Sequence, residues 1–458
     1  MHPTRVPVFE GMTPRRVDMP TCGARIHLLG LLALLVCGCA DDDTPSGPCD
    51  ARFVVCQEQL AREVSIARGG PRVELPPVEV ITEAELRQRY DDEMMEPTPA
   101  EARELDLWGR ALMLLRLVDS PAALTTGSLE DFFTNVAGFY DPATGSITIV
   151  DRGVPVSLSD ATYVFAHELT HRAQDVDQTA GFAAHEGLAD SLDGVDALAH
   201  HGEGEAVVVG NLVLTSLRGD ELSAQDWRDY FAEWLAAERA AVVSTGDPFI
   251  AVRSRLKYVV GGAYLMDAWL AGGSDGLREQ WNPGILQTAS WMRGYDSRIA
   301  ATAFLECEFP RAPTGYTAWT NERLGGELLF PMLVPDGQTA ETYLEGSWTS
   351  AMGWRGDHLR VFVATSPAEP VAVAYRVRAA GVDEARDIAA RLRAAQAEDV
   401  VVYEDAADVL LLVSAEPGVW DSWSYPAGCF NLPMGVSPVR MHALADRLPV
   451  TGIVRRHH

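Results

Sequence analysis

The chain has 458 residues, enough for more than one hydrophobic core, so two folded units are expected. Hydrophobic residues make up 47% and charged residues 22%, which is the composition of a globular protein. The formal net charge is −28, with 65 acidic and 37 basic residues, and no cluster of lysine and arginine follows the pattern of a phosphate-binding surface. These numbers exclude nucleic acid as an expected partner and disfavour electrostatic attraction to anionic lipid.

Residues 1–39 have the features of an export signal. Arg25 precedes an apolar run over residues 26–36, which is too short to span a bilayer. The run ends in the letters VCGC, which resemble a bacterial lipobox, where small residues precede a cysteine that becomes lipidated. The resemblance implies a lipid on Cys39 and attachment within the cell envelope, at the outer membrane or the periplasmic face. A plain secretory signal is the alternative.

The expected organisation has four parts. Residues 1–39 form the signal, and residues 40–75 form a tether and linker that begins with a polar stretch rich in turn formers. A mainly helical domain follows over residues 76–305, and a smaller α+β domain with an antiparallel sheet over residues 306–458. The predicted fold class is therefore α+β.

Four cysteines follow Cys39, namely Cys49, Cys56, Cys307 and Cys429. An even number in an oxidising compartment predicts two disulfides, which can pair in three ways. We expect Cys49 to pair with Cys56 and Cys307 with Cys429, with unpaired buried thiols as the alternative.

Hydrophobic periodicity predicts the elements in chain order. A helix is expected over residues 101–118, then a turn at 138–142, a strand over 146–150, and a helix that Ser157 caps and that continues through Leu169. Further helices are predicted over 186–198, 203–217, 227–243 and 256–270. The C-terminal part is predicted to contain strands over 358–364, 371–377, 400–403 and 409–413 and a helix over 383–395.

The letters HELTH at residues 167–171 carry the most specific chemistry. Residues four apart lie on one face of a helix, so His167 and His171 can bind a single ion. Glu168 lies about 100° around the helix and can reach a water on that ion. Two imidazoles with a carboxylate suit Zn²⁺ and leave one position for water. A surface helix with two coincidental histidines is the alternative.

A catalytic zinc needs a third protein ligand. The glycine and histidine that extend this motif in metzincins are missing, whereas gluzincins use a glutamate on a later helix, which leaves Glu186, Glu203 and Glu205. Glu203 is preferred, because the glycines on both sides of it would let its helix start approach the metal helix closely. Glu186 is the alternative, since Asp190 four residues on could orient an imidazole.

The chain also resembles a group of secreted bacterial zinc metallopeptidases of gluzincin type. The resemblance implies a zincin-like catalytic domain in which Glu203 is the third zinc ligand. It spans about residues 137–390 and rests on residues 138–141, 167–175, 203–206 and 353–357 and on Tyr258 with Gly261 and Gly262.

The expected function is zinc-dependent hydrolysis of peptide bonds in a protein or peptide substrate, at a membrane reached through the N-terminal lipid. Zinc lowers the pKa of a bound water toward about 7, and Glu168 acts as general base before it protonates the leaving amine. Tyr258 or Tyr264 is expected to donate to the oxyanion, although a core tyrosine is the common alternative. Residues 146–150 are interpreted either as an edge strand above the metal that binds an extended peptide or as a strand that completes the sheet.

Two other functions fit the same residues. One is a catalytically inactive zinc-binding lipoprotein with a binding or structural role, and the other is hydrolysis of a non-peptide amide, such as one in cell-wall material. The carboxylate of Glu168 favours an enzyme over the inactive protein. His185, His200 and His201 are interpreted as ordinary polar residues, any of which could donate to an oxyanion.

Overall fold

The computed structural model describes most of the chain between residues 47 and 421. The described ranges are 47–93, 97–124, 133, 136–182, 189–281, 287–295, 301–304, 309–396 and 400–421. The predicted signal with Cys39 lies outside these ranges, as do His185, Glu186, Cys307 and Cys429. Within the described ranges, every helix is too short or too polar to cross a membrane.

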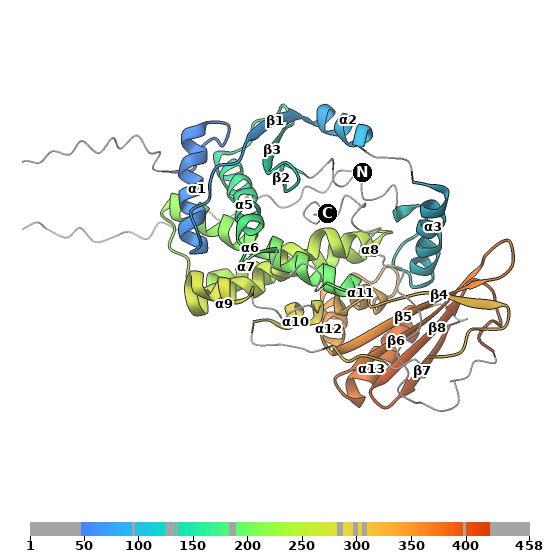
Figure 1. The fold of residues 1–458 in the computed structure, drawn as a ribbon. Helices are drawn as coiled ribbons and strands as arrows, with labels where there is room; N and C mark the ends of the chain where they lie inside the picture. The colour runs from blue at the N-terminus through green and yellow to red at the C-terminus, as the bar shows by residue number, and fades with distance from the viewer. Residues whose placement is uncertain are drawn as a thin grey trace, which may run out of the picture.

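The fold combines many helices with two separate sheets, in agreement with the predicted α+β class (Figure 1). The helices of the first part are α1 (Val54–Arg68), α2 (Glu83–Glu93), α3 (Pro99–Leu114), α5 (Leu158–Val176), α6 (Leu192–Arg218), α7 (Ala224–Val243), α8 (Pro248–Ala251), the π-helix η2 (Val252–Leu256), α9 (Lys257–Glu279) and α10 (Thr288–Arg293). The later helices are α11 (Gly326–Met332), α12 (Glu341–Met352) and α13 (Val382–Ala395).

The helix α5 begins where capping chemistry predicts it. Ser157 accepts a hydrogen bond from the backbone N–H of Asp160, which satisfies one of the free donors of the first turn. The helix α3 is shorter than predicted, because Arg116 has a φ of 59° and a left-handed residue cannot continue an α-helix.

Two helices predicted over residues 186–198 and 203–217 are one helix in the structure. The helix α6 runs without a break from Leu192 to Arg218, so Glu203 lies near its middle and not at a helix start. Gly202 and Gly204 lower helix propensity, but both are buried against other parts of the chain, and packing outweighs propensity here.

The first sheet has three strands in the order β1-β3-β2, formed by Val78–Thr82, Ser146–Asp151 and Gly138–Asp141. The prediction that residues 146–150 form an edge strand is wrong, because β1 pairs with β3 in parallel on one side and β2 pairs antiparallel on the other. The parallel partner comes from residues before α2, a long-range pairing that no local pattern indicates. The edge strand that packs against α5 is β2.

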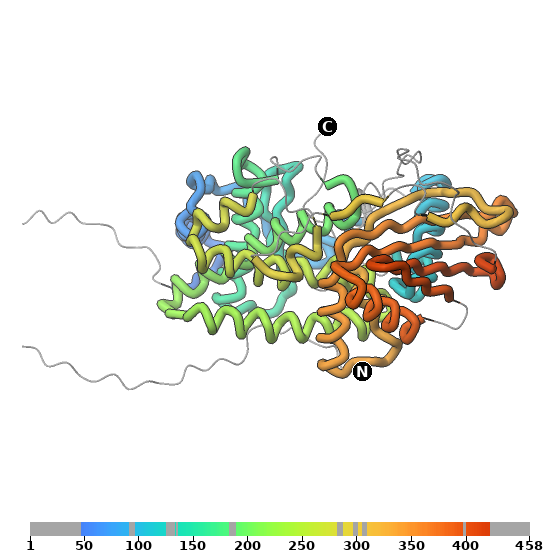
Figure 2. Tube along the Cα trace, turned by 90° about the horizontal axis from the view of Figure 1, so that it is seen from below, coloured from blue at the N-terminus to red at the C-terminus, as the bar shows by residue number. Residues whose placement is uncertain are grey.

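The second sheet has five antiparallel strands in the order β4-β5-β6-β8-β7, as predicted for the C-terminal part. The strands are β4 (Tyr316–Glu322), β5 (Trp354–Ala364), β6 (Val371–Ala379), β7 (Val401–Asp405) and β8 (Asp408–Ser414). Figure 2 shows this sheet at one end of the molecule and α1 at the other. A single hydrophobic core cluster includes residues of both the helical part and the sheet, among them Trp108, Leu169, Val259 and Tyr375.

One predicted disulfide is present. Cys49 and Cys56 are bonded at the start of α1. The second predicted pair lies outside the described residues.

Candidate metal centre

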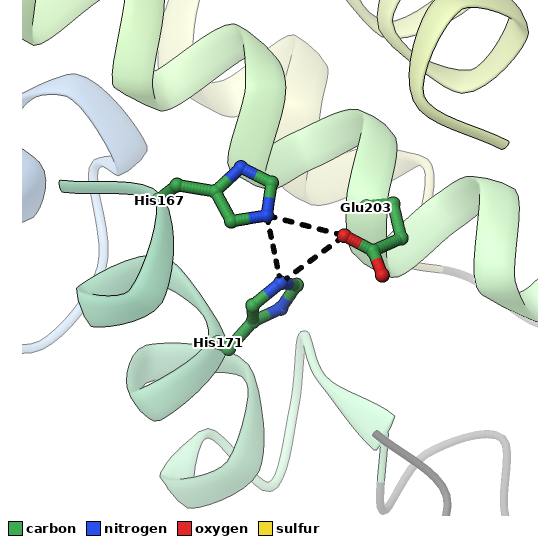
Figure 3. Close-up of side chains that lie close together, drawn as sticks. All are labelled: His167, His171 and Glu203. Carbon is green, nitrogen blue, oxygen red and sulfur yellow. Dashed lines mark hydrogen bonds and ion pairs between the residues drawn. The ribbon is translucent and has the colours of Figure 1, made fainter. Parts of the chain in front are cut away.

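The helix α5 presents both motif histidines toward one point. His167 and His171 are four residues apart, and their Nε2 atoms lie 3.1 Å from each other (Figure 3). Both side chains are buried. The predicted convergence of the two imidazoles is therefore present in the structure.

Glu203 completes the group from α6. Its Oε2 atom lies 3.1 Å from Nε2 of His167 and 3.3 Å from Nε2 of His171. Figure 3 shows the carboxylate pointing between the two rings. These three side chains form a buried group that could hold a metal ion. The alternative ligand, Glu186, lies outside the described residues.

The spacing of the three atoms can be compared with metal geometry. Ligands at about 2.0–2.1 Å in a tetrahedral arrangement lie about 3.3–3.4 Å from one another. The observed separations of 3.1 to 3.3 Å are close to that spacing. A large oxygen-preferring cation such as Ca²⁺, with ligands at 2.3–2.6 Å, fits a mainly imidazole group less well. The residues present therefore fit a small divalent transition-metal ion.

Gln174 orients one of the two imidazoles. Nδ1 of His171 donates to Oε1 of Gln174 over 2.8 Å, because an amide oxygen can only accept. This tautomer leaves the lone pair of Nε2 directed at the other ligands. Gln174 is itself held, since its Nε2 donates to the Gly202 carbonyl and to Oε2 of Glu205, each over 2.9 Å. Nδ1 of His167 is buried and makes no hydrogen bond to the described residues.

Lys257 holds the other oxygen of the ligand glutamate. Its Nζ, on the first turn of α9, donates to Oε1 of Glu203 over 2.9 Å, and both side chains are buried. Burial alone would raise the pKa of Glu203, but Lys257 and the two histidines outweigh it and hold that pKa well below its usual range. Glu203 is therefore a carboxylate with Oε2 turned toward the imidazoles.

A close crossing of α6 and α9 places Lys257 against Glu203. A Cβ atom built on Gly204 would lie 2.3 Å from the carbonyl carbon of Gly261, and one on Gly261 would lie 2.1 Å from the oxygen of His200. Only glycine allows the two backbones this close. Gly204 thus serves the approach of α9, whereas a Cβ atom on Gly202 would meet the ring of Phe182 and lie 3.7 Å from Oε1 of Gln174 on α5.

Glu168 faces the edge strand β2. Its Oε2 accepts a hydrogen bond of 2.8 Å from the backbone N–H of Tyr140, and the side chain is buried. Burial lowers the pKa of His171, but Glu203 and, to a smaller extent, Glu168 outweigh burial and raise that pKa, so the Glu168 carboxylate lies near this imidazole. Glu168 is therefore close to the ligand group without belonging to it.

The two tyrosines considered as oxyanion donors lie in different surroundings. The ring of Tyr258 lies 6.0 Å from that of His167, and burial, Glu203 and Glu168 raise its pKa well above the usual value, so its hydroxyl keeps the proton. Tyr264 packs in the core against Trp291, and its hydroxyl points to Gln280, so the alternative of a core tyrosine describes Tyr264.

Three further residues of this centre were not predicted. Gln174 and Lys257 support the ligands as described, and the ring of Tyr163 lies 6.1 Å from that of His167. Gln174 and Tyr163 lie three residues after and four residues before a motif histidine, so helical spacing could have indicated both.

His200 and His201, the other two candidate histidines within the described ranges, contact residues outside the metal-binding group. Nε2 of His200 lies 2.7 Å from Oε1 of Glu327, and the ring of His201 stacks on Trp281 with centroids 3.7 Å apart. Neither ring belongs to the metal-binding group.

No protein-family model, curated protein or solved structure matches the chain. The geometry of the metal centre is therefore the basis for inferring a function.

Proposed function

We propose that this chain is a zinc-dependent metallopeptidase of gluzincin type with a zincin-like catalytic domain. The observation that carries the proposal is the convergence of His167, His171 and Glu203 from two helices, with Glu168 next to His167. Two imidazole nitrogens and one carboxylate are the ligand set of zinc hydrolases that keep one open position. Zinc, when bound, supplies Lewis-acid activation of a water and of the scissile carbonyl.

Glu168 moves the proton in this proposal. Its carboxylate takes a proton from the attacking water and delivers it to the leaving amine. The backbone N–H of Tyr140 donates to Oε2 of this carboxylate, so the other oxygen is left for the proton. The hydroxyl of Tyr258, which stays protonated, donates to the oxyanion.

The strand β2 supplies the binding mode for a peptide. In the described sheet, β2 pairs only with β3. Successive residues of β2 alternate in direction, and the backbone N–H and C=O groups of Gly138 and Tyr140 point away from β3. An extended peptide can add to this edge by main-chain hydrogen bonds, beside α5 and its histidines. Tyr140 donates its N–H to Glu168 and keeps its carbonyl for this edge, which couples substrate position to the general base.

We also propose that a lipid on Cys39 attaches the chain to a membrane of the cell envelope. The proposal rests on the apolar run and the small residues before that cysteine. Radiolabelled fatty acid incorporated by the wild type and lost in Cys39→Ser would support it, and equal labelling would contradict it.

Glu168→Gln tests the enzyme assignment. The substitution keeps the size of the side chain and the acceptor for Tyr140, but it removes the base. The variant should bind one zinc, as the wild type does, and lose at least about 100-fold in cleavage of a peptide library. Equal cleavage by both proteins would contradict the role of Glu168, and zinc without cleavage in the wild type would favour the inactive binding protein. Cleavage of non-peptide amides alone would redirect the proposal to that substrate class.

A further inference from the structure

Residues 54–68 of the predicted tether and linker form the packed helix α1, and exposed apolar side chains gather near its start. Thirteen large apolar residues are exposed in the described part of the chain, and six of them lie in two short segments. The exposed fraction of each of these six residues is between 53% and 65%. The segments are the start of α1, with the residue before it, and the loop that leads into the first residue of α5. We call their exposed side chains the apolar face: Phe53, Val54, Val55, Val154, Val156 and Leu158.

The two segments are joined by specific contacts. The backbone N–H of Cys49 donates to Oγ1 of Thr162 over 3.0 Å, and that hydroxyl donates to the Cys49 carbonyl over 3.2 Å. Thr162 lies one turn after Leu158 on α5, and the disulfide fixes the start of α1 to Cys49. The helices α1 and α5 lie side by side (Figure 1). The apolar face therefore lies at the N-terminal ends of two helices that pack against each other.

The chain limits how far this face can lie from a lipid on Cys39. The peptide units between Cys39 and Gly47 span no more than about 29 Å when fully extended. A single acyl chain gives only marginal binding, and stable attachment takes a second signal. With a net charge of −28 and no basic cluster, electrostatic attraction to lipid cannot supply that signal. Exposed apolar side chains close to the tether can supply this second signal.

We propose that the apolar face inserts into the boundary between the headgroups and the acyl chains of a neutral lipid bilayer. The proposal rests on the lipid anchor proposed above. It orients the protein with the N-terminus of α5 toward the membrane. His167 lies nine residues beyond Leu158, about 14 Å along the helix axis. The metal centre then acts on protein segments close to the membrane surface.

Fluorescence of the full, lipidated chain in phosphatidylcholine vesicles tests this orientation. An environment-sensitive fluorophore is attached to Val156→Cys and, as a matched control, to Val382→Cys, because Val382 is 52% exposed on the distant helix α13. Wild type treated with the same reagent corrects for native cysteines. The label at 156 should shift to the blue and be quenched by nitroxide lipids, whereas the label at 382 should do neither.

Three results would overturn the proposal. The first is equal emission and equal quenching at both positions while the protein floats with the vesicles. The second is a blue shift at 156 without vesicles that grows with protein concentration, which would assign the face to a second copy of the chain. The third is a full chain that does not float, which removes the anchor and this orientation together. Zinc content and peptide cleavage, measured on the same preparation, decide the peptidase proposal separately.

Discussion

Nζ of Lys257 donates to Oε1 of Glu203 across the crossing of α9 and α6, while Oε2 of the same carboxylate faces the two histidines. One glutamate thus joins a buried cation to the candidate metal position. The ion pair balances the charge of Glu203 in the protein without metal, and a metal ion would add a second positive charge on the other oxygen.

Lys257→Met should therefore affect the two forms of the protein differently. Without metal, the variant leaves a buried carboxylate without its cation, which should cost on the order of 3–5 kcal/mol in the free energy of unfolding. With zinc, the ion replaces much of the lost charge, so zinc should stabilise the variant more than the wild type. Urea unfolding with chelator and with zinc measures both differences. An equal loss in the two conditions would show that Lys257 does not act through Glu203.

Gln174→Leu should weaken metal binding without removing a ligand. His171 would lose the acceptor that fixes its tautomer and ring orientation. Loss of such a partner typically costs 10- to 100-fold in metal affinity. Competition with a chromogenic chelator measures the change. Gln178→Leu is the matched control, because Gln178 is exposed, and its affinity should equal that of the wild type.

Gly204→Ala should disturb the helix crossing. The added methyl group would lie 2.3 Å from the carbonyl carbon of Gly261, and backbone atoms cannot move aside cheaply. The free energy of unfolding should fall by about 3 kcal/mol, with a loss of zinc affinity because Glu203 is displaced. Gly272→Ala on α9 has no heavy atom within 4 Å of the added group and should stay within about 1 kcal/mol of wild type. Similar stability of the two variants would contradict the crossing.

Asp193 predicts a pH dependence of stability. Burial raises its pKa to about 7 against the attraction of Arg323, with a further contribution from Asp357. Because the folded pKa exceeds the usual 3.8, the folded state binds more protons between about pH 4 and pH 7. This contribution to stability is complete below pH 4 and is lost as the pH rises through 7.

Asp193→Asn isolates this group, since the amide oxygen can still accept from Thr288. From pH 5 to pH 8 the wild type should lose on the order of 2–3 kcal/mol more unfolding free energy than the variant. Urea unfolding at the two pH values measures the difference. Parallel pH profiles would assign Asp193 an ordinary pKa in the folded state.

Local patterns predicted the local part of the centre. The spacing of His167 and His171 and the cap at Ser157 depend only on neighbouring residues, and both agree with the structure. Glu203 was preferred because of its flanking glycines and because of a family resemblance, and the structure brings its carboxylate to the histidines. The disulfide between Cys49 and Cys56 also follows from short spacing.

Contacts between distant segments were not predictable in the same way. Lys257 meets Glu203 only because two helices cross at glycines, and β3 becomes an interior strand only because β1 pairs with it. Tyr258 and Tyr264 have similar sequence surroundings, and only packing separates the tyrosine near His167 from the one in the core. The division at residues 305 and 306 remains a prediction, although one core cluster extends across it.

Anomalous diffraction at the zinc absorption edge, from crystals of the full chain grown with zinc, tests the central claim most directly. We expect one strong peak about 2.0–2.2 Å from Nε2 of His167, Nε2 of His171 and Oε2 of Glu203. A peak bound by other residues, or crystals with no peak between these three atoms, would contradict the proposed metal centre.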